Sequence, residues 1–119
     1  MGLRARRRAL SGEAGSGSVL AVALVAATVA VALAVLALSA GLSVRQRLIG
    51  TADAAALAAA DGASGGVPGA PCELARRVAA ATGARLQSCR IDGLIASVEV
   101  AGAFGAVPIS AHSRAGPPP

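Results

Sequence analysis

The sequence of 119 residues has almost no aromatic side chains, since it contains one Phe and neither Trp nor Tyr. It also has no Lys, because all eleven basic residues are Arg. Surfaces that bind single-stranded nucleic acid combine basic side chains with stacking aromatic rings, so the scarcity of aromatic residues argues against a nucleic-acid partner. This scarcity also leaves few bulky side chains for a globular interior, although 55% of the residues are hydrophobic.

Side chains that commonly catalyse reactions are also scarce. His112 is the only His, and no Ser and acid accompany it in a recognised catalytic motif. The glycine-rich stretch "GASGGVPG" (Gly62–Gly69) lacks the Lys-Ser/Thr of a phosphate-binding loop. Asp53 and Asp61 would lie on one helix face about 12 Å apart, too far for two carboxylates that act on one bond. We therefore expect no enzyme and no cofactor, with His112 a surface or half-buried strand residue.

One long apolar run dominates the N-terminal half. It extends from Val19 to Ala40 without a charge, and Thr28 and Ser39 are its only polar residues. As a helix it would measure roughly 33 Å, which is enough to cross a hydrocarbon core of about 30 Å. The run therefore predicts a transmembrane helix.

The basic residues on either side of this run indicate an orientation. Four of them precede it, namely Arg4, Arg6, Arg7 and Arg8, against Arg45 and Arg47 shortly after it. Positive residues favour the cytoplasmic side, so we expect a single-pass protein of the cell membrane with a cytoplasmic N-terminus and an extracytoplasmic C-terminal part. The alternative is a signal peptide cut near Ala40, within "LSAG", that releases a small secreted protein. The run is longer than the 7–15 apolar residues typical of signal peptides, which favours the anchor.

Beyond the apolar run, the chain continues as an alanine-rich segment. Ala54–Ala60 is six Ala and one Leu, which are strong helix formers. We predict one helix from near Ser18 to about Ala60, with a bend at Gly50, ended by Asp61-Gly62. Small side chains allow close helix packing, so sister subunits are expected to pack on Ala52, Asp53, Ala56 and Ala59. Asp53 would then meet an Arg of a neighbouring subunit or water, whereas a simple structural stalk is the alternative for the segment.

This segment resembles a known family. "ADAAALAAADG" (Ala52–Gly62), preceded by "RQRLIGT" (Arg45–Thr51), is similar to the signature of TadE/TadG-like proteins of tight-adherence (Flp) pilus assembly. "GSGSVLAVALVAA" (Gly15–Ala27) resembles the start of their membrane helix. Cys72, together with "CRIDG" from Cys89, resembles a short TadE-like subset from a helicase and secretion gene neighbourhood.

The resemblance implies a non-enzymatic, pseudopilin-like membrane component of a pilus or secretion apparatus. Its partners would be the membrane and other pilin-like or secretion-apparatus subunits, with self-association a further expectation. Gly15 and Gly17 are the candidate residues for leader cleavage. Pilin-like substrates usually carry a Glu five residues after the cut, but Leu20 and Val22 stand there. We therefore expect an uncleaved or differently processed chain.

The C-terminal part reads as a small helix and a sheet. "PCELARRVAAATG" (Pro71–Gly83) has helical spacing of Leu74 and Val78, and Gly83 is suited to end it. "RLQSCRIDGLIASVEV" (Arg85–Val100) predicts a hairpin with a type I′ turn at Asp92-Gly93, and Val107–Ser113 is a candidate third strand. Strict alternation would place Leu86 on the face of Ser88 and Arg90, opposite Cys89 and Ile91.

The expected fold class is thus α+β, with a long pilin-like membrane-spanning helix, a small helix and a two- or three-stranded antiparallel sheet. The expected divisions are a basic cytoplasmic segment (1–17), the membrane helix with its alanine-rich extension (18–61), a loop (62–71), the small extracytoplasmic domain (72–114) and a disordered tail (115–119).

The two cysteines are expected to form a disulfide outside the cytoplasm. Pairing of Cys72 with Cys89 would close a loop worth about 3 kcal/mol in the chain-entropy estimate. Free or metal-binding thiols are the alternative, but His112 leaves the set without a fourth ligand, so no metal is expected. Three functions remain for the chain: a pilin-like component, a secreted disulfide-stabilised protein, and a membrane-anchored hydrolase or binding module.

Overall fold

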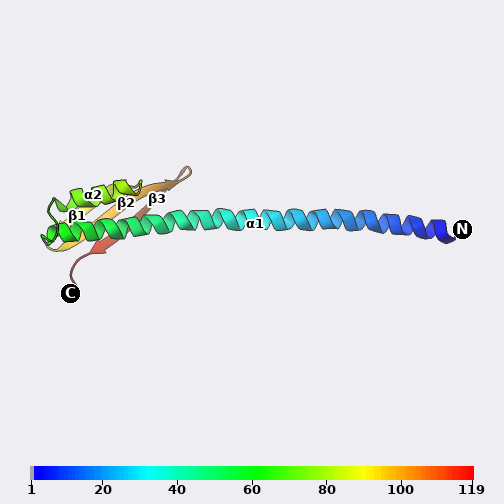
Figure 1. The fold of residues 1–119 in the computed structure, drawn as a ribbon, viewed down its shortest axis with the longest axis horizontal. Coiled ribbons are helices and arrows are strands. Elements are labelled where there is room, and N and C mark those ends of the chain that lie inside the picture. Colours follow the sequence, from blue (N-terminus) through cyan, green and yellow to red (C-terminus); the bar gives the residue numbers. More distant parts are fainter. Residues whose placement is uncertain (1) are drawn as a thin grey trace. The chain divides into compact units, whose positions relative to one another are not determined.

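The computed structural model describes residues 2–119, with side chains from Gly15 onward. In chain order, the elements are α1 (Gly2–Ala63), α2 (Pro71–Ala81), β1 (Arg85–Asp92), β2 (Ile95–Phe104) and β3 (Val107–Ala115) (Figure 1). These elements confirm the predicted α+β class. The chain divides into two compact units, residues 1–39 and 40–119, which we call the N-terminal and C-terminal units. The predicted basic cluster at residues 4–8 lies outside the side chains that the structure describes.

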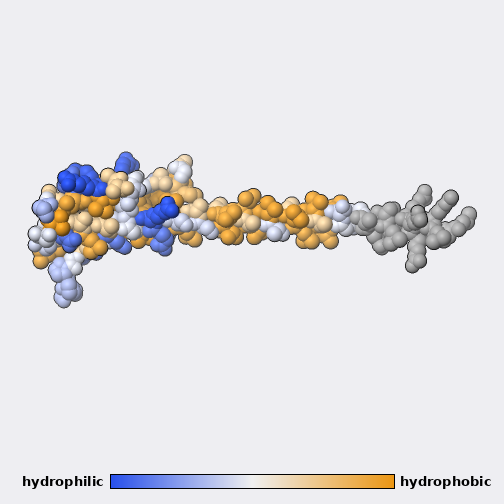
Figure 2. Space-filling model, viewed as in Figure 1, coloured by the Kyte–Doolittle hydropathy of each residue, from blue (hydrophilic) through white to orange (hydrophobic). Residues whose placement is uncertain are grey.

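Between Val19 and Leu38 of the N-terminal unit, α1 presents large apolar side chains to its surroundings. Figure 2 shows this coloured stretch as predominantly apolar surface. The exposed Val and Leu side chains between Val19 and Leu38 have 51% to 71% of their surface accessible. The hydroxyls of Thr28 and Ser39 donate hydrogen bonds to backbone carbonyls one turn earlier, at 2.8 Å each. This helix can therefore satisfy its own polar side chains in hydrocarbon. Within residues 15–119, α1 is the one helix long and apolar enough to cross a membrane.

In the C-terminal unit, the last part of α1 buries one face. α1 passes through Gly50 as a single helix. Residues spaced three and four apart along it are buried, namely Leu48, Thr51, Ala52, Ala55, Ala56 and Ala59. Such spacing places side chains on one face of a helix. This face packs into the core of the C-terminal unit, together with residues of α2 and of the sheet.

The turn from α1 to α2 depends on a close approach at Gly62. A Cβ atom at this position would lie 2.8 Å from Cδ1 of Leu74 and 3.1 Å from Cα of Pro71. α2 begins with Pro71, which suits the first turn because its missing N–H needs no partner there. Gly83 follows α2 with a φ of +78°, which confirms its predicted role in ending the helix.

The sheet has the order β1-β2-β3 with antiparallel neighbours, so the candidate third strand is confirmed. The expectation of strict alternation along β1 is wrong. The register shifts between Leu86 and Ser88, which leaves Gln87 as an extra residue in the strand. The bulge turns Leu86 to the face of Cys89 and Ile91, and all three pack against the core.

The predicted type I′ turn is also wrong. Asp92 pairs with Ile95, so the two-residue loop of this hairpin is Gly93-Leu94. Gly93 has a φ of +60°, and no residue other than Gly has a positive φ in the described chain. Positive φ at the first loop residue alone is typical of a type II′ turn. The β2–β3 hairpin follows the same rule, with Gly105 at +60° in the loop Gly105-Ala106.

The core of the C-terminal unit consists almost entirely of small side chains. Nine of its twelve buried hydrophobic residues are Ala, and the other three are Leu48, Val98 and Val100. The largest side chain that is fully buried is Val100. Small side chains bury little apolar area each, so burial alone stabilises this unit weakly.

Candidate functional site

The small face of the alanine-rich part of α1 packs against its own chain, whereas we expected it to pack against sister subunits. Ala52, Ala56 and Ala59 have no exposed surface, because they face the core of their own C-terminal unit. A neighbouring subunit therefore cannot reach them while this unit is folded. The small side chains do permit a close approach, but the elements that approach are the same chain's own. The opposite side of the helix, with Gly50, Asp53 and Leu57, is the one left exposed.

Asp53, the fourth residue of the predicted packing surface, is exposed and has a partner within the chain. The hydroxyl of Ser113 on β3 donates a hydrogen bond of 2.6 Å to its Oδ1. This bond connects α1 to the edge strand of the sheet. Nothing in the sequence spacing indicates it, because the two residues are sixty positions apart.

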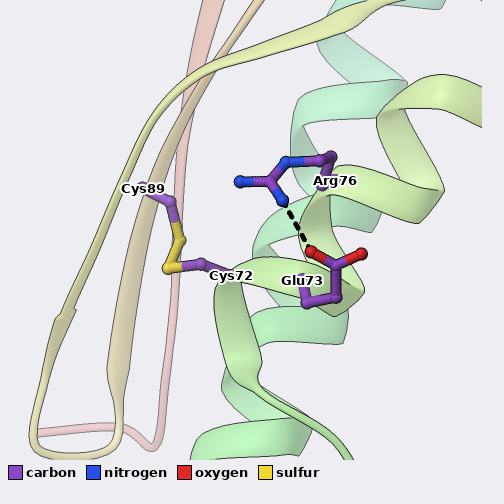
Figure 3. The surroundings of a disulfide bond; sticks show 4 residues. All are labelled: Cys72, Glu73, Arg76 and Cys89. Carbon is purple, nitrogen blue, oxygen red and sulfur yellow. Dashed lines mark hydrogen bonds and ion pairs between the residues drawn. A yellow bond between two sulfur atoms is a disulfide. The ribbon is translucent and has the colours of Figure 1, made fainter.

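The structure contains the disulfide expected between Cys72 and Cys89 (Figure 3). Cys72 lies in the first turn of α2 and Cys89 in the middle of β1. The disulfide thereby fixes α2 against the sheet. Leu86 and Ile91 flank it on the same face of β1, because the bulge at Gln87 brings all three residues into register.

Beside the disulfide, α2 carries a charged and exposed surface. Arg76 contacts Glu73 at 2.6 Å (Figure 3). Arg77 also approaches Glu73, at 3.8 Å. Ion pairs between exposed side chains contribute little to stability. This cluster is therefore a solvated face of the unit.

The candidate catalytic residues are not brought together. His112 is exposed, and its Nε2 lies 3.5 Å from Oε1 of Glu99, the residue directly across from it on β2. Within residues 15–119, no three side chains of His, Cys, Asp or Glu are grouped so that they could hold a metal ion. A groove of about 480 Å³ beside α1 has Arg47 as its one charged lining residue and is otherwise lined by small or apolar residues and two Thr.

The candidate cleavage residues Gly15 and Gly17 lie within α1 and are exposed. No contact distinguishes one from the other, since a Cβ atom at either position would meet nothing within 4 Å. Their processing stays a prediction.

Two contacts in the C-terminal unit were missed by sequence reasoning. The hydroxyl of Thr51 lies 3.0 Å from that of Thr82 and joins α1 to the end of α2. Phe104 lies against Gly41 of α1, where a Cβ atom would be 3.8 Å from its Cε1. The sequence shows that Phe104 is the only aromatic residue, but it does not indicate that Phe104 contacts α1.

These observations define a class of protein: an apolar helix suited to a membrane that continues without interruption into a small, disulfide-linked α+β unit. Residues 15–62 match the family described as "Putative Flp pilus-assembly TadE/G-like". The resemblance seen in the sequence is therefore confirmed for this segment, which covers the apolar run and the alanine-rich continuation. No curated protein and no solved structure matches the chain.

Proposed function

We propose that this chain is a non-enzymatic, single-pass, pseudopilin-like component of a tight-adherence-type pilus or secretion apparatus. The observation that carries the proposal is the TadE/G-like match over residues 15–62, which ends one residue before α1 does. The matched segment is thus a continuous helix that serves two environments. Its first part is suited to lipid and its last part forms the core of the C-terminal unit.

Assembly would use the membrane part of α1. Ala residues recur there at alternating spacings of four and three, at positions 23, 27, 30, 34 and 37. This spacing keeps small side chains on one face of a helix, and small residues let the backbones of two membrane helices approach. The alanine-rich extension cannot supply this surface, because its small face is already buried. Its proposed role is to hold the C-terminal unit directly on the membrane helix.

The proposed orientation places the N-terminus in the cytoplasm and the C-terminal unit outside. The excess of Arg before the apolar run supports it, as does the disulfide, since disulfides persist mainly in oxidising compartments. The proposed divisions of the chain follow the expected ones, but α2 begins at Pro71 and β3 continues to Ala115.

Release by signal peptidase near Ala40 is the competing function. Ala40 lies inside α1, and the next residue, Gly41, packs against Phe104. A cut here would leave the extension with the C-terminal unit, because the buried residues of α1 begin at Leu48. The anchored form is instead favoured by the length of the apolar run, which exceeds that of a typical signal peptide.

The test is the size of the membrane complex formed in the native host. Ala30→Leu and Ala34→Leu, on the small face, should each abolish the high-mass complex on a native gel while the protein stays in the membrane. Leu36→Ile, on another face, should leave the complex intact. N-terminal sequencing of the same samples decides between the two functions. Released protein that begins near Gly41 would contradict the proposal and establish the secreted form.

A further inference from the structure

The closed end of the β2–β3 hairpin is an exposed apolar surface. Residues Ala103–Pro108, "AFGAVP", contain no polar side chain, and all six are exposed. Phe104 and Val107 have 40% and 62% of their surface free. The pairing of β1 with β2 ends at Ala101, so this end of the hairpin extends beyond β1 (Figure 1).

The hairpin end lies along the part of α1 that belongs to the C-terminal unit. Gly102 is next to Leu48, whose Cδ1 would be 3.3 Å from a Cβ atom at residue 102. Two residues further along β2, Phe104 contacts Gly41. The strand therefore runs along α1 from Leu48 to Gly41 as it approaches its turn, and Gly41 directly follows the run Val19–Ala40 in the sequence.

The first residues of α1 after this run carry no charge. They are Gly41, Leu42, Ser43 and Val44, and Arg45 is the first charged residue. Four residues of helix rise about 6 Å, and the headgroup layer on each side of a bilayer is about 5–7 Å thick. Phe104, packed on Gly41, therefore lies at the depth of the headgroups when Val19–Ala40 fills the hydrocarbon core.

We propose that the hairpin end Ala103–Pro108 inserts into the headgroup layer of the bilayer that α1 crosses, with Phe104 and Val107 in contact with lipid. The proposal rests on the proposed membrane-spanning role of α1. The only aromatic residue of the chain stands at this boundary, and aromatic rings are favoured at membrane interfaces. Continuity with the apolar run identifies the occupant as lipid.

The absence of Trp and Tyr allows a direct test, because one introduced Trp is the only such fluorophore in the full chain. Ala106→Trp places it in the β2–β3 loop. Leu94→Trp is the matched control, since both residues are the second position of a two-residue loop that begins with a Gly of φ +60°. Phe104→Trp is a second probe of the same surface, and Val29→Trp reports on the membrane helix itself. Each variant is reconstituted in phosphatidylcholine vesicles that contain lipids brominated either near the headgroup or deep in the acyl chain.

The expected result is several-fold stronger quenching of Ala106→Trp and Phe104→Trp than of Leu94→Trp by the shallow bromolipid. Water-soluble acrylamide should show the opposite order. Val29→Trp should be quenched best by the deep bromolipid. If Val29→Trp is quenched but both hairpin probes behave like Leu94→Trp, the hairpin proposal is wrong and the membrane helix stands.

If Val29→Trp also escapes the bromolipids, the membrane-spanning role itself fails, and the hairpin proposal fails with it. A blue-shifted hairpin probe that neither bromolipid quenches would mean that protein covers the surface, most simply a second copy. That outcome also overturns the proposal.

Discussion

Two stretches of α1 use apolar residues in opposite ways. Between Val19 and Leu38, large Val and Leu side chains point outward. Between Leu48 and Ala59, the buried face is mostly Ala, and large residues such as Leu57 are exposed. Lipid accommodates large side chains without specific packing, whereas the close-packed interior of a protein accepts only what fits. The residue size that suits each stretch therefore reflects what surrounds it.

The strongest test of this comparison uses two leucines of nearly equal exposure. Leu33 is 61% exposed and Leu57 is 58% exposed in the isolated chain. Leu33→Arg should make membrane insertion less favourable by up to about 3.5 kcal/mol, because a charge would enter the hydrocarbon. Leu57→Arg should change it by almost nothing. Alkaline extraction and insertion assays of both variants measure the difference, and equal behaviour would contradict the boundary near Ala40.

The next test addresses the weak alanine core of the C-terminal unit. The double variant Cys72→Ser/Cys89→Ser should lower the free energy of unfolding of this unit by about 3 kcal/mol, the chain-entropy estimate for its loop. Denaturant unfolding of the full chain in detergent, followed by circular dichroism, measures the change. Adding a reductant to the parent chain should reproduce the effect, and should do nothing further to the double variant. A loss well below 1 kcal/mol would mean that the disulfide restricts the unfolded chain less than its loop length indicates.

A smaller effect should distinguish the two faces of the extension. Ala56 is fully buried and Ala54 is exposed, two residues away on the same helix. Ala56→Leu should destabilise the C-terminal unit by about 1–3 kcal/mol through overpacking, whereas Ala54→Leu should be nearly neutral. Thermal unfolding of the two variants provides the comparison. Equal melting temperatures would show that residue 56 does not face a packed core.

The elements that depend on local sequence were predictable. The apolar run, the helix-forming alanines, the glycines near turns and the hairpin pattern each have a local physical cause. The disulfide was also predictable, because two cysteines allow one intramolecular pairing. Local rules were less reliable for details within an element. The bulge at Gln87 and the turn at Gly93-Leu94 depend on how β1 and β2 match across the sheet.

The surroundings of the alanine-rich face were not predictable. Its small side chains indicate that something packs closely, but not whether this is another chain or a later part of the same one. The Asp53–Ser113 hydrogen bond and the contact of Phe104 with Gly41 join residues sixty or more positions apart. Such contacts depend on the tertiary fold, and no local pattern in the sequence indicates them.

The buried face of the extension also limits which substitutions this part of α1 can tolerate. A larger residue at position 52, 55, 56 or 59 meets the sheet or α2, while glycine there would weaken the helix by about 1 kcal/mol per site. Alanine alone combines minimal volume with maximal helix preference. The repeated alanines of this stretch resemble a simple bias of composition. They are explained instead by the small space between this face and the elements packed on it.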